Sequence, residues 1–542
     1  MSASQDKKKR TQQRADGTER RQVASRKAAQ EKKKSRTKWI IGSIVVVLLI
    51  AFIIAGNSNL FYTAQKAVKI NGKSYSVAEF NYEYMSVYQQ YSQLYSQYLG
   101  DASAVAPDAP YTGDDEDGDA FKTWDDFYRD SAIRSIAQKE ALVSMAEEAG
   151  VELTEEEIQE VDDSLETMRT MATQYGYANL SKFLSANYGN GVTEKLARQL
   201  MLRDALATKY QTYYQDNLTY TDEQLQAAYT ENKDEYDSYS FSYYFVQAES
   251  ETTTDADGNE TATVSEASMA AAKETADKIL AESNGTAEGF AAAVAANGAP
   301  TSTPETDENG QAVVDDEGNP VTTETPAEPT AAEGTQGSEL TTNALPFGDW
   351  LKEADRAVGD MTVVEQAENG YYVVLFQGRD DNSYNTVNVR HILIQAEDAD
   401  GDGAYSEEEL AAAKVRIEEI KAEYEAGEQT EDAFAALANK YSTDGGSNTN
   451  GGLYENVYRG QMIAEFNDFC FDPARQPGDV EIIEDTTYNG YHLMYYVGEG
   501  ENYQNVLARN ALTSDAMSAF SASLTENIDF QELFAMRYAG IK

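Results

Sequence analysis

The stretch Asn388-Val-Arg-His-Ile-Leu-Ile-Gln395 contains one of only two histidines in a chain of 542 residues. The second lies in another short apolar run, Asn489-Gly-Tyr-His-Leu-Met494. Runs of this length, rich in β-branched and aromatic residues and bounded by turn residues, predict strands. We therefore expect each histidine to lie on a strand of one small domain.

The chain repeats itself around these two runs. Tyr243-Tyr-Phe-Val-Gln-Ala-Glu249 matches His391-Ile-Leu-Ile-Gln-Ala-Glu397 in position and character. Asn369-Gly-Tyr-Tyr-Val373 matches Asn489-Gly-Tyr-His-Leu493 in the same way. Between the paired runs both segments follow the order helix, helix, short helix. Two copies of one α+β unit around a small sheet are therefore predicted.

We place the two copies at residues 238–380 and 386–505. Both histidines of the second copy are replaced by tyrosines in the first, Tyr243 and Tyr372. The imidazoles therefore belong to one copy and to one predicted site. The first copy is expected to be a degenerate form of the same fold.

The N-terminus predicts a membrane anchor. Residues 1–38 form a basic tail with 14 Lys and Arg residues against four acidic ones, and residues 39–56 carry no charge. An apolar helix of this length spans roughly 27 Å, enough for a thin hydrocarbon core. The basic flank predicts a cytoplasmic N-terminus and an extracellular remainder. A cleaved signal peptide is the alternative, but its apolar region would be shorter and would end at an A-x-A-like site.

The remaining residues are strongly acidic, because the whole chain has a net charge of −50 despite its basic tail. Such a charge argues against nucleic acid and anionic lipid as partners of this part. The single cysteine, Cys470, excludes an intramolecular disulfide framework and is expected to be buried and inert.

Residues 60–236 are predicted to form a helical domain behind a small hairpin, whose turn is Asn71-Gly72. Capping boxes mark three helix starts. The first of these helices carries an aromatic stripe at helical spacing. This stripe is expected to be core, or else a surface that grips unfolded chains. The capping boxes begin at Ser76, Thr154 and Thr221, and the stripe consists of Phe80, Tyr84, Tyr88, Tyr91, Tyr95 and Tyr98.

Two further segments stand out by composition. Residues 296–345 contain five of the ten prolines and no Lys or Arg, so they are predicted to be a disordered insertion in the first copy. Residues 506–542 return to a helical pattern and are expected to form a C-terminal helix that packs back on the helical domain.

The second copy resembles a parvulin-type peptidyl-prolyl isomerase across its whole length. The matching motifs occur in order and, as a set, are specific to that family. With the helical domain and the C-terminal helix, the architecture resembles the PrsA and SurA group of extracytoplasmic foldases. The motifs are Arg390-His-Ile-Leu393, Phe434-Ala-Ala-Leu-Ala438, Tyr441-Ser-Thr-Asp444, Gly451-Gly-Leu453, Gly460-Gln-Met462, Phe466, Phe471, Thr487 and Gly490-Tyr-His492.

The resemblance implies a site without metal or cofactor. Its catalytic group would be His391 and His492, side by side on neighbouring strands and linked by hydrogen bonds with Thr487, together with Asp444. The family's Gly-Gly-Asp-Leu is Asn-Gly-Gly-Leu here, ending at Leu453, which changes the loop over the pocket. The proline-binding residues implied by the resemblance are Leu453, Gln461, Met462, Phe466 and Phe471.

The resemblance implies a membrane-anchored foldase that isomerises X-Pro bonds of unfolded or newly exported proteins, on a Gram-positive-type cell surface. The alternative is a holdase whose helical domain binds clients while isomerase activity is dispensable. Acidic residues follow the first histidine strand, which argues against phosphorylated substrates. In that loop, residues 398–409 fit an EF-hand ligand pattern, but Ser406 and Glu409 also form a capping box, so calcium binding stays open.

Overall fold

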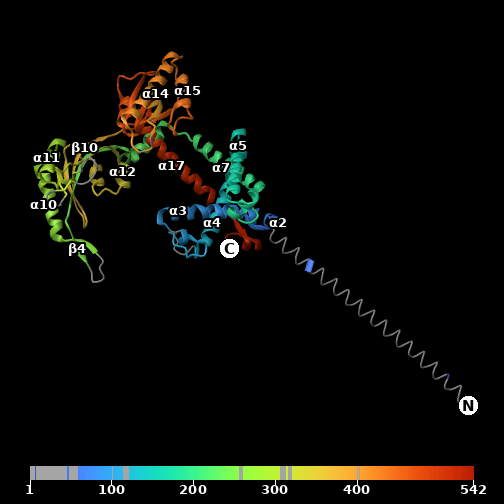
Figure 1. Ribbon diagram of the computed structural model, residues 1–542. Helices are drawn as coiled ribbons and strands as arrows, with labels where there is room; N and C mark the ends of the chain where they lie inside the picture. Colours follow the sequence, from blue (N-terminus) through green and yellow to red (C-terminus); the bar gives the residue numbers. More distant parts are fainter. Residues whose placement is uncertain are drawn as a thin grey trace. The chain divides into compact units, whose positions relative to one another are not determined.

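The computed structural model of the chain divides into two compact units, residues 1–218 with 515–542, and residues 219–514 (Figure 1). It describes residue 7 and residues 46–47, 59–100, 102–113, 121–254, 260–305, 313–314, 320–399, 401 and 403–541. The predicted tail and anchor lie outside these residues, except for positions 7, 46 and 47. Among the helices that the structure does describe, none is long and apolar enough to span a bilayer.

The first unit is mainly helical, as predicted, but it ends at residue 218 rather than 236. The two short helices that follow, α8 (Asp222–Glu231) and α9 (Lys233–Tyr236), belong to the second unit. The helices of the first unit are α2 (Asn59–Ala64), α3 (Val77–Leu99), α4 (Trp124–Ala149), α5 (Glu155–Gln174), α6 (Leu180–Tyr188), α7 (Glu194–Asp216) and the end of α17 (Tyr503–Thr525). It also contains the 3-10 turns η1 (Ala102–Val105) and η2 (Phe534–Tyr538).

The predicted hairpin is confirmed as β1 (Lys66–Ile70) and β2 (Lys73–Ser76). Asn71 and Gly72 both have positive φ, 46° and 85°, as a type I′ turn requires. The C-terminal segment adds a third strand, β15 (Phe530–Glu532), which pairs with β1. The segment after α17 is therefore a strand and a 3-10 turn rather than a continued helix.

The three capping boxes form as predicted. The aromatic stripe of α3 is mostly core: Phe80 and Tyr84 are fully buried, and the next three tyrosines pack against the same cluster around Trp124 and Tyr128. Only its end is open, where Tyr98 is 74% exposed. The stripe therefore holds α3 on α4 and leaves little of itself free.

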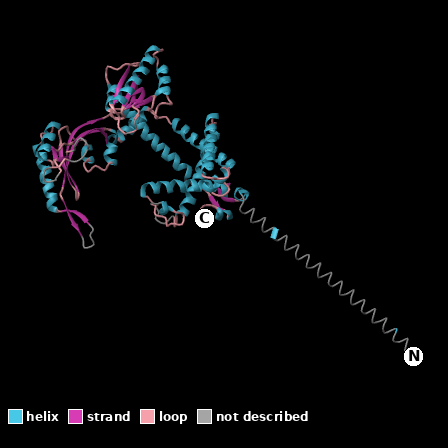
Figure 2. Ribbon diagram, in the orientation of Figure 1, coloured by secondary structure: helices cyan, strands magenta, loops and turns pink. Residues whose placement is uncertain are grey.

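The second unit contains two four-stranded antiparallel sheets with the same topology (Figure 2). Their strand orders are β8-β3-β10-β9 and β12-β11-β14-β13, so the repeat found in the sequence is a repeat of structure. The strands are β3 (Ser238–Gln247), β8 (Thr330–Gln336), β9 (Met361–Gln366) and β10 (Gly370–Asp380) in the first sheet, and β11 (Asn385–Gln395), β12 (Leu453–Val457), β13 (Val480–Asp485) and β14 (Gly490–Asn502) in the second.

Each sheet has helices on both faces, because successive side chains of a strand point to opposite faces. In the second domain Ile392 and Leu493 pack with α14 and α15, whereas Val389 and Met494 pack with α16. The helices are α10 (Glu266–Glu282), α11 (Ala287–Asn297), α12 (Gly337–Thr342) and α13 (Gly348–Lys352) in the first domain, and α14 (Glu407–Ala426), α15 (Glu431–Tyr441) and α16 (Ala464–Phe471) in the second.

The prediction that residues 296–345 form a disordered insertion is wrong for the C-terminal part of this segment, which contains β8 and α12. Strand β8 pairs with β3, and helix α12 buries Leu340 in the core on one face of the sheet. Composition misled here because an edge strand is held by backbone hydrogen bonds to its neighbour and needs little apolar burial of its own. Two further strands, β6 (Thr301–Pro304) and β7 (Thr322–Thr325), form an exposed hairpin, and residues 306–312 and 315–319 lie outside the described residues.

Candidate active site

Two neighbouring strands place the histidines on the same face of the second sheet. His391 of β11 is opposite Met494 of β14, and Leu393 is opposite His492, so the two imidazoles are diagonal neighbours. Both face α16, and both are buried, at 3% and 6% exposure. The pairing predicted from two separate sequence motifs is therefore present in the fold.

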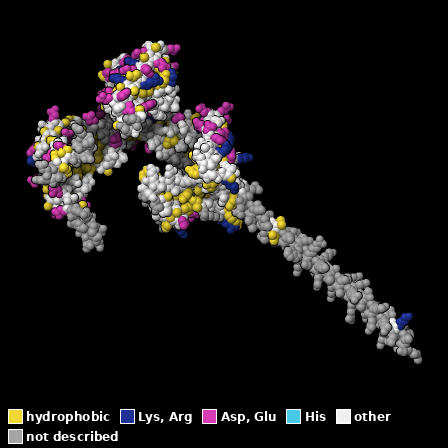
Figure 3. Space-filling model, in the orientation of Figure 1, with side chains coloured by type: hydrophobic (Ala, Val, Ile, Leu, Met, Phe, Trp, Pro, Cys, Tyr) yellow, Lys and Arg dark blue, Asp and Glu magenta, His cyan; other side chains and the backbone are white. Residues whose placement is uncertain are grey.

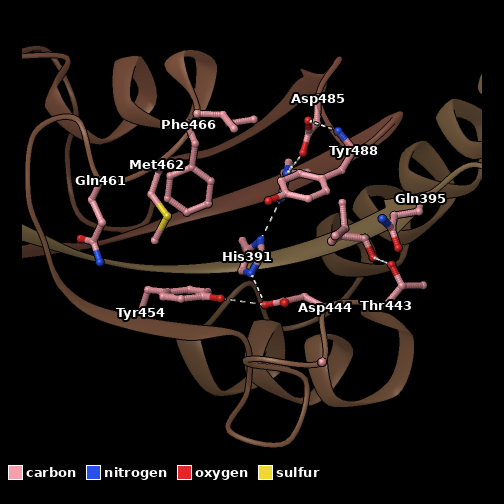
Figure 4. Close-up of a pocket in the computed structure, with 14 residues that line it drawn as sticks. His391, Gln395, Thr443, Asp444, Tyr454, Gln461, Met462, Phe466, Asp485 and Tyr488 are labelled. Atoms are coloured by element: carbon pink, nitrogen blue, oxygen red, sulfur yellow. Dashed lines mark hydrogen bonds and ion pairs between the residues drawn. The ribbon is translucent and has the colours of Figure 1, made fainter. Parts of the chain in front are cut away.

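The two imidazoles join two carboxylates into one chain of polar contacts (Figure 4). The Nδ1 atoms of His391 and His492 are 2.8 Å apart. The Nε2 atom of His391 lies 2.9 Å from Oδ2 of Asp444, and the Nε2 atom of His492 lies 2.8 Å from Oδ2 of Asp485. Each ring nitrogen thus has a polar partner within hydrogen-bond distance, and Nε2 of His391 has a second one, the Ser447 hydroxyl at 3.1 Å.

Asp444 lies in the loop after α15, at one end of this chain. Its Oδ1 accepts a hydrogen bond from the backbone N–H of Gly446 at 3.1 Å, and its Oδ2 accepts one from the Tyr454 hydroxyl at 3.1 Å. The hydroxyl of Ser447 also donates to Oδ2. The hydrogen bond from His391, with those from Ser447 and the Gly446 N–H, holds the pKa of Asp444 well below its usual range. The carboxylate is therefore ionised at neutral pH.

Asp485 lies at the other end of the chain and was missed by the sequence reasoning. It is the last residue of β13 and is 1% exposed. Its Oδ1 accepts hydrogen bonds from the backbone N–H groups of Thr487 and Tyr488, at 2.9 and 2.8 Å. An aspartate that binds the backbone two and three residues ahead is a turn signal, and this signal was readable in the sequence.

Thr487 differs from expectation. Within the described part of the chain its hydroxyl has no hydrogen bond to either imidazole, and the partner of His492 is Asp485 instead. Thr487 takes part through its backbone N–H, which anchors the Asp485 carboxylate. A catalytic role for the Thr487 side chain stays a prediction.

A cavity of about 440 Å³ opens over the His391–His492 pair. One wall is apolar and includes Met462 and Phe466, whose ring centroid is 5.6 Å from that of His391 and 5.7 Å from that of His492. The lining residues are His391, Leu393, Gln395, Thr443, Asp444, Gly445, Tyr454, Gln461, Met462, Ile463, Phe466, Asp485, Tyr488 and His492.

This cavity brings together most, but not all, of the predicted site residues. Gln461, Met462 and Phe466 line it, whereas Leu453 and Phe471 do not. Leu453 begins the edge strand β12 and pairs with Arg390. The Phe471 ring lies 5.9 Å from that of Tyr384, away from the imidazoles. Tyr454, Ile463 and Tyr488 are lining residues that the motifs did not identify.

The matching place in the first domain is filled with aromatic rings. Tyr243 and Tyr372 occupy the positions of the two histidines, with ring centroids 5.9 Å apart. Phe347, the counterpart of Phe466, is fully buried and lies 5.5 Å from Tyr243 and 5.2 Å from Tyr372. The polar chain of the second domain is replaced here by an aromatic cluster.

Comparison with protein families identifies two parts of the chain. The model of the PPIC-type PPIASE domain matches residues 371–497, which include both histidines. The model of the SurA-like N-terminal domain matches residues 28–188.

Two curated relatives share part of the chain. "Foldase protein PrsA 1" of Listeria innocua is 32% identical over 142 residues, covering 24% of this chain and 40% of that protein. The protein of the same name from Listeria monocytogenes gives the same identity and coverage. The chain therefore spans less than half the length of these relatives.

Crystal structures titled as the peptidylprolyl isomerase PrsA also match in part. The one from Bacillus cereus has 26% identity and covers 27% of this chain and 49% of that chain, with a TM-score of 0.17. The one from Bacillus anthracis has 21% identity and covers 27% and 59%, with the same TM-score. On the two family matches and the curated relatives, the chain contains a PPIC-type, parvulin rotamase domain behind a SurA-like N-terminal domain, and PrsA foldases are its distant relatives.

Proposed function

We propose that this protein is an extracytoplasmic foldase whose second α+β domain, residues 386–505, isomerises X-Pro bonds of unfolded client proteins. The observation that carries the proposal is the chain Asp444–His391–His492–Asp485 at the floor of an apolar cavity. The PPIC-type family match and the PrsA relatives support it independently.

The reaction requires neither a nucleophile nor a metal. Rotation about an X-Pro bond has a barrier of roughly 20 kcal/mol, set by amide resonance. A cavity lined by Met462 and Phe466 would hold the pyrrolidine ring away from water. The polar floor would favour the twisted amide over the planar one, because a twisted amide loses resonance and its carbonyl and nitrogen change polarity.

The first α+β domain is proposed to be catalytically silent. Its aromatic cluster has no imidazole, and Phe347 packs against both of the tyrosines that replace the histidines. A tyrosine has a single hydroxyl, so it cannot replace an imidazole that contacts the other imidazole through one ring nitrogen and a carboxylate through the other. We assign this domain a role as spacer or client-binding surface.

The helical unit is proposed to bind clients. Large apolar side chains are exposed on it, including Leu94 at 46%, Tyr98 at 74% and Tyr175 at 74%. Such residues can contact apolar segments of an unfolded chain. Client binding by this unit is common to the foldase and to the second candidate function, a holdase in which isomerase activity is dispensable.

The membrane-anchored arrangement is also part of the proposal. It rests on the uncharged run 39–56 behind a basic tail, with the acidic remainder outside the cell. Figure 3 shows acidic side chains spread over the visible face of both α+β domains, as suits a soluble surface that repels anionic lipid. Protease accessibility in intact cells tests this: the α+β domains should be cleaved and the basic tail protected.

Refolding of a proline-limited protein tests the catalytic proposal directly. The full chain should accelerate the slow refolding phase, which takes tens of seconds uncatalysed. The same preparation should suppress aggregation of a denatured client. Acceleration without suppression would remove the chaperone role, and suppression without acceleration would leave only the holdase.

A further inference from the structure

The polar chain of the active site contains three contacts that each require one proton. These are Asp485 to Nε2 of His492, Nδ1 of His492 to Nδ1 of His391, and Nε2 of His391 to Asp444. Two neutral imidazoles carry only two protons, and an ionised carboxylate carries none. One contact in the chain would then place two lone pairs against each other at 2.8 or 2.9 Å.

Asp485 decides how the protons are arranged on His492. Its Oδ1 is fixed as an acceptor by the two backbone N–H groups of Thr487 and Tyr488, which favours the ionised form. Its Oδ2 therefore requires a donor, and His492 supplies one from Nε2. If His492 is neutral, its Nδ1 then has only a lone pair to present to His391.

His391 must then donate at both nitrogens. Its Nδ1 faces the lone pair on His492, and its Nε2 faces the Asp444 carboxylate. The Ser447 hydroxyl, 3.1 Å from Nε2, does not remove the requirement, because it donates its single proton to Asp444. An imidazole with both nitrogens protonated is an imidazolium.

The surroundings agree with this assignment. Burial, followed by the neighbouring His391, lowers the pKa of His492, so the extra proton is disfavoured there. The titratable groups around the pair are Asp444 from the loop after α15, Tyr454 from β12, Asp485 from β13 and Tyr488 from the following turn. With the tyrosines neutral, two carboxylates enclose the pair, so one positive charge is electrostatically favoured.

We propose that Asp485 is a positioning residue that fixes His492 as its Nε2–H tautomer and thereby keeps His391 as an imidazolium between His492 and Asp444. The charge lies at the floor of the cavity that would hold the proline ring. The effect on isomerisation rests on the proposed function, whereas the proton arrangement does not. Loss of the third proton from this pair should lower isomerase activity.

Nitrogen NMR of the full chain labelled only at histidine tests the arrangement, because no other histidine contributes signals. At neutral pH three of the four ring nitrogens should carry a proton, and the bare one should be Nδ1 of His492. Two protonated nitrogens in the wild-type protein, or a bare Nε2 on His492, would overturn the proposal.

The variant Asp485→Asn is expected to reverse the tautomer of His492. The two backbone N–H groups keep the Asn carbonyl oxygen in the Oδ1 position, so the amide NH₂ faces Nε2 of His492. His492 must then carry its proton on Nδ1, and two protons satisfy the chain. We expect the loss of one protonated nitrogen at neutral pH, and a shift of the alkaline limb of the activity profile to lower pH by about one unit or more.

Glu484→Gln is the matched control. It removes a carboxylate from the adjacent, exposed position of β13, on the opposite face of the strand. Three protonated nitrogens and an unshifted activity profile are expected. If Asp485→Asn retains three protonated histidine ring nitrogens, the proposal fails. If this variant does not fold, the number of protonated ring nitrogens in the wild-type spectrum still tests the proposal. Wild-type protein with three protons but no isomerase activity would contradict the proposed function and leave the role of Asp485 standing.

Discussion

Strands β3 and β10 of the first α+β domain pair like strands β11 and β14 of the second. Tyr243 is opposite Val374 and Phe245 is opposite Tyr372, just as His391 is opposite Met494 and Leu393 is opposite His492. The backbones place the same two positions side by side in both sheets. The domains differ in what those positions carry, two phenols or two imidazoles.

This difference separates what the fold needs from what the site needs. In the first domain the two tyrosines pack with Phe347 and Phe245, and rings occupy the space. In the second, the smaller imidazoles are held by buried hydrogen bonds and leave a cavity beside Phe466. The same sheet topology carries phenols in one domain and imidazoles in the other, so this topology does not by itself demand histidine at these positions.

The largest effect is expected from replacing the two imidazoles. His391→Ala with His492→Ala should reduce prolyl isomerisation by at least about a hundredfold, the order expected for loss of a preorganised polar group. Tyr243→Phe with Tyr372→Phe, at the matching positions, should leave it unchanged. A standard prolyl-peptide assay on the full chain measures both.

Loss of activity in the variant with Tyr243→Phe and Tyr372→Phe would contradict the assignment of catalysis to the second domain. Full activity of the variant with His391→Ala and His492→Ala, with a folded protein shown by circular dichroism, would contradict it as well. If the double variant His391→Ala with His492→Ala still suppresses client aggregation, the holdase activity lies outside this site.

The next effect concerns the apolar wall of the cavity, which contains Met462 and Phe466. Phe466 is 3% exposed and is also part of the core around Met494, whereas Met462 is only half-buried. Met462→Ala should lower isomerase activity about tenfold with little loss of stability. Phe466→Ala should also destabilise the domain by about 3–5 kcal/mol, as for large-to-small changes in a core.

Chemical denaturation measures how much each wall residue contributes to stability, and the peptide assay measures how much it contributes to isomerase activity. Phe347→Ala in the first domain is the matched variant, since that ring is fully buried too. It should cost similar stability and no activity. Full activity of folded Met462→Ala would place the proline ring elsewhere.

The sequence predicted local structure and the pairing of motifs well, for physical reasons. The Asn71-Gly72 turn and the capping boxes depend on residues within four positions, so they are readable directly. The repeat assigned both histidine runs to one site, and the family resemblance implied that they lie side by side on neighbouring strands. Asp485 was missed because its contact with His492 depends on how the turn after β13 folds back.

Other errors arose where tertiary structure overrode local composition. Strand β8 looked disordered because its Thr, Glu and Gly residues bury little, yet β3 supplies its hydrogen bonds. Leu453 and Phe471 are in motifs of the family but are not among the residues that line the cavity. A motif gives the residues of a site only where the backbone turns each side chain inward.

Removal of the first α+β domain should change isomerisation little. The ends of the segment are neighbours, since Ser238 pairs with Asp380, and the Tyr229 hydroxyl bonds to both Asp237 and the carbonyl of Asp381. Joining Asp237 to Asp381 therefore deletes residues 238–380 without stretching the chain. Peptide isomerisation within about twofold of wild type, with weaker suppression of aggregation, is the expected outcome. A large loss of isomerisation would show that the first domain supports the site.

The smallest expected effect lies at the starts of α10 and α14, the first helix of each α+β repeat after its first sheet strand. The hydroxyl of Ser265 caps α10 by accepting from Ser268 N–H, and that of Ser406 caps α14 by accepting from Glu409 N–H. Replacing either serine by alanine should cost about 1 kcal/mol of local stability. Amide hydrogen exchange in the first turns of α10 and α14 measures this, with unchanged peptide isomerisation as the control.

The two caps differ in one way, which bears on the EF-hand pattern of residues 398–409. The Glu409 carboxylate accepts backbone N–H bonds from Ser406 at 2.8 Å and from Ala399 at 2.7 Å, whereas α10 has no acid at that position. Calcium would need both oxygens of this glutamate and would have to break those bonds. We therefore expect no heat on titration with millimolar calcium and no change in exchange at α14. A calcium-dependent heat that Glu409→Gln abolishes would show instead that the loop is a calcium site and that its capping bonds yield to the ion.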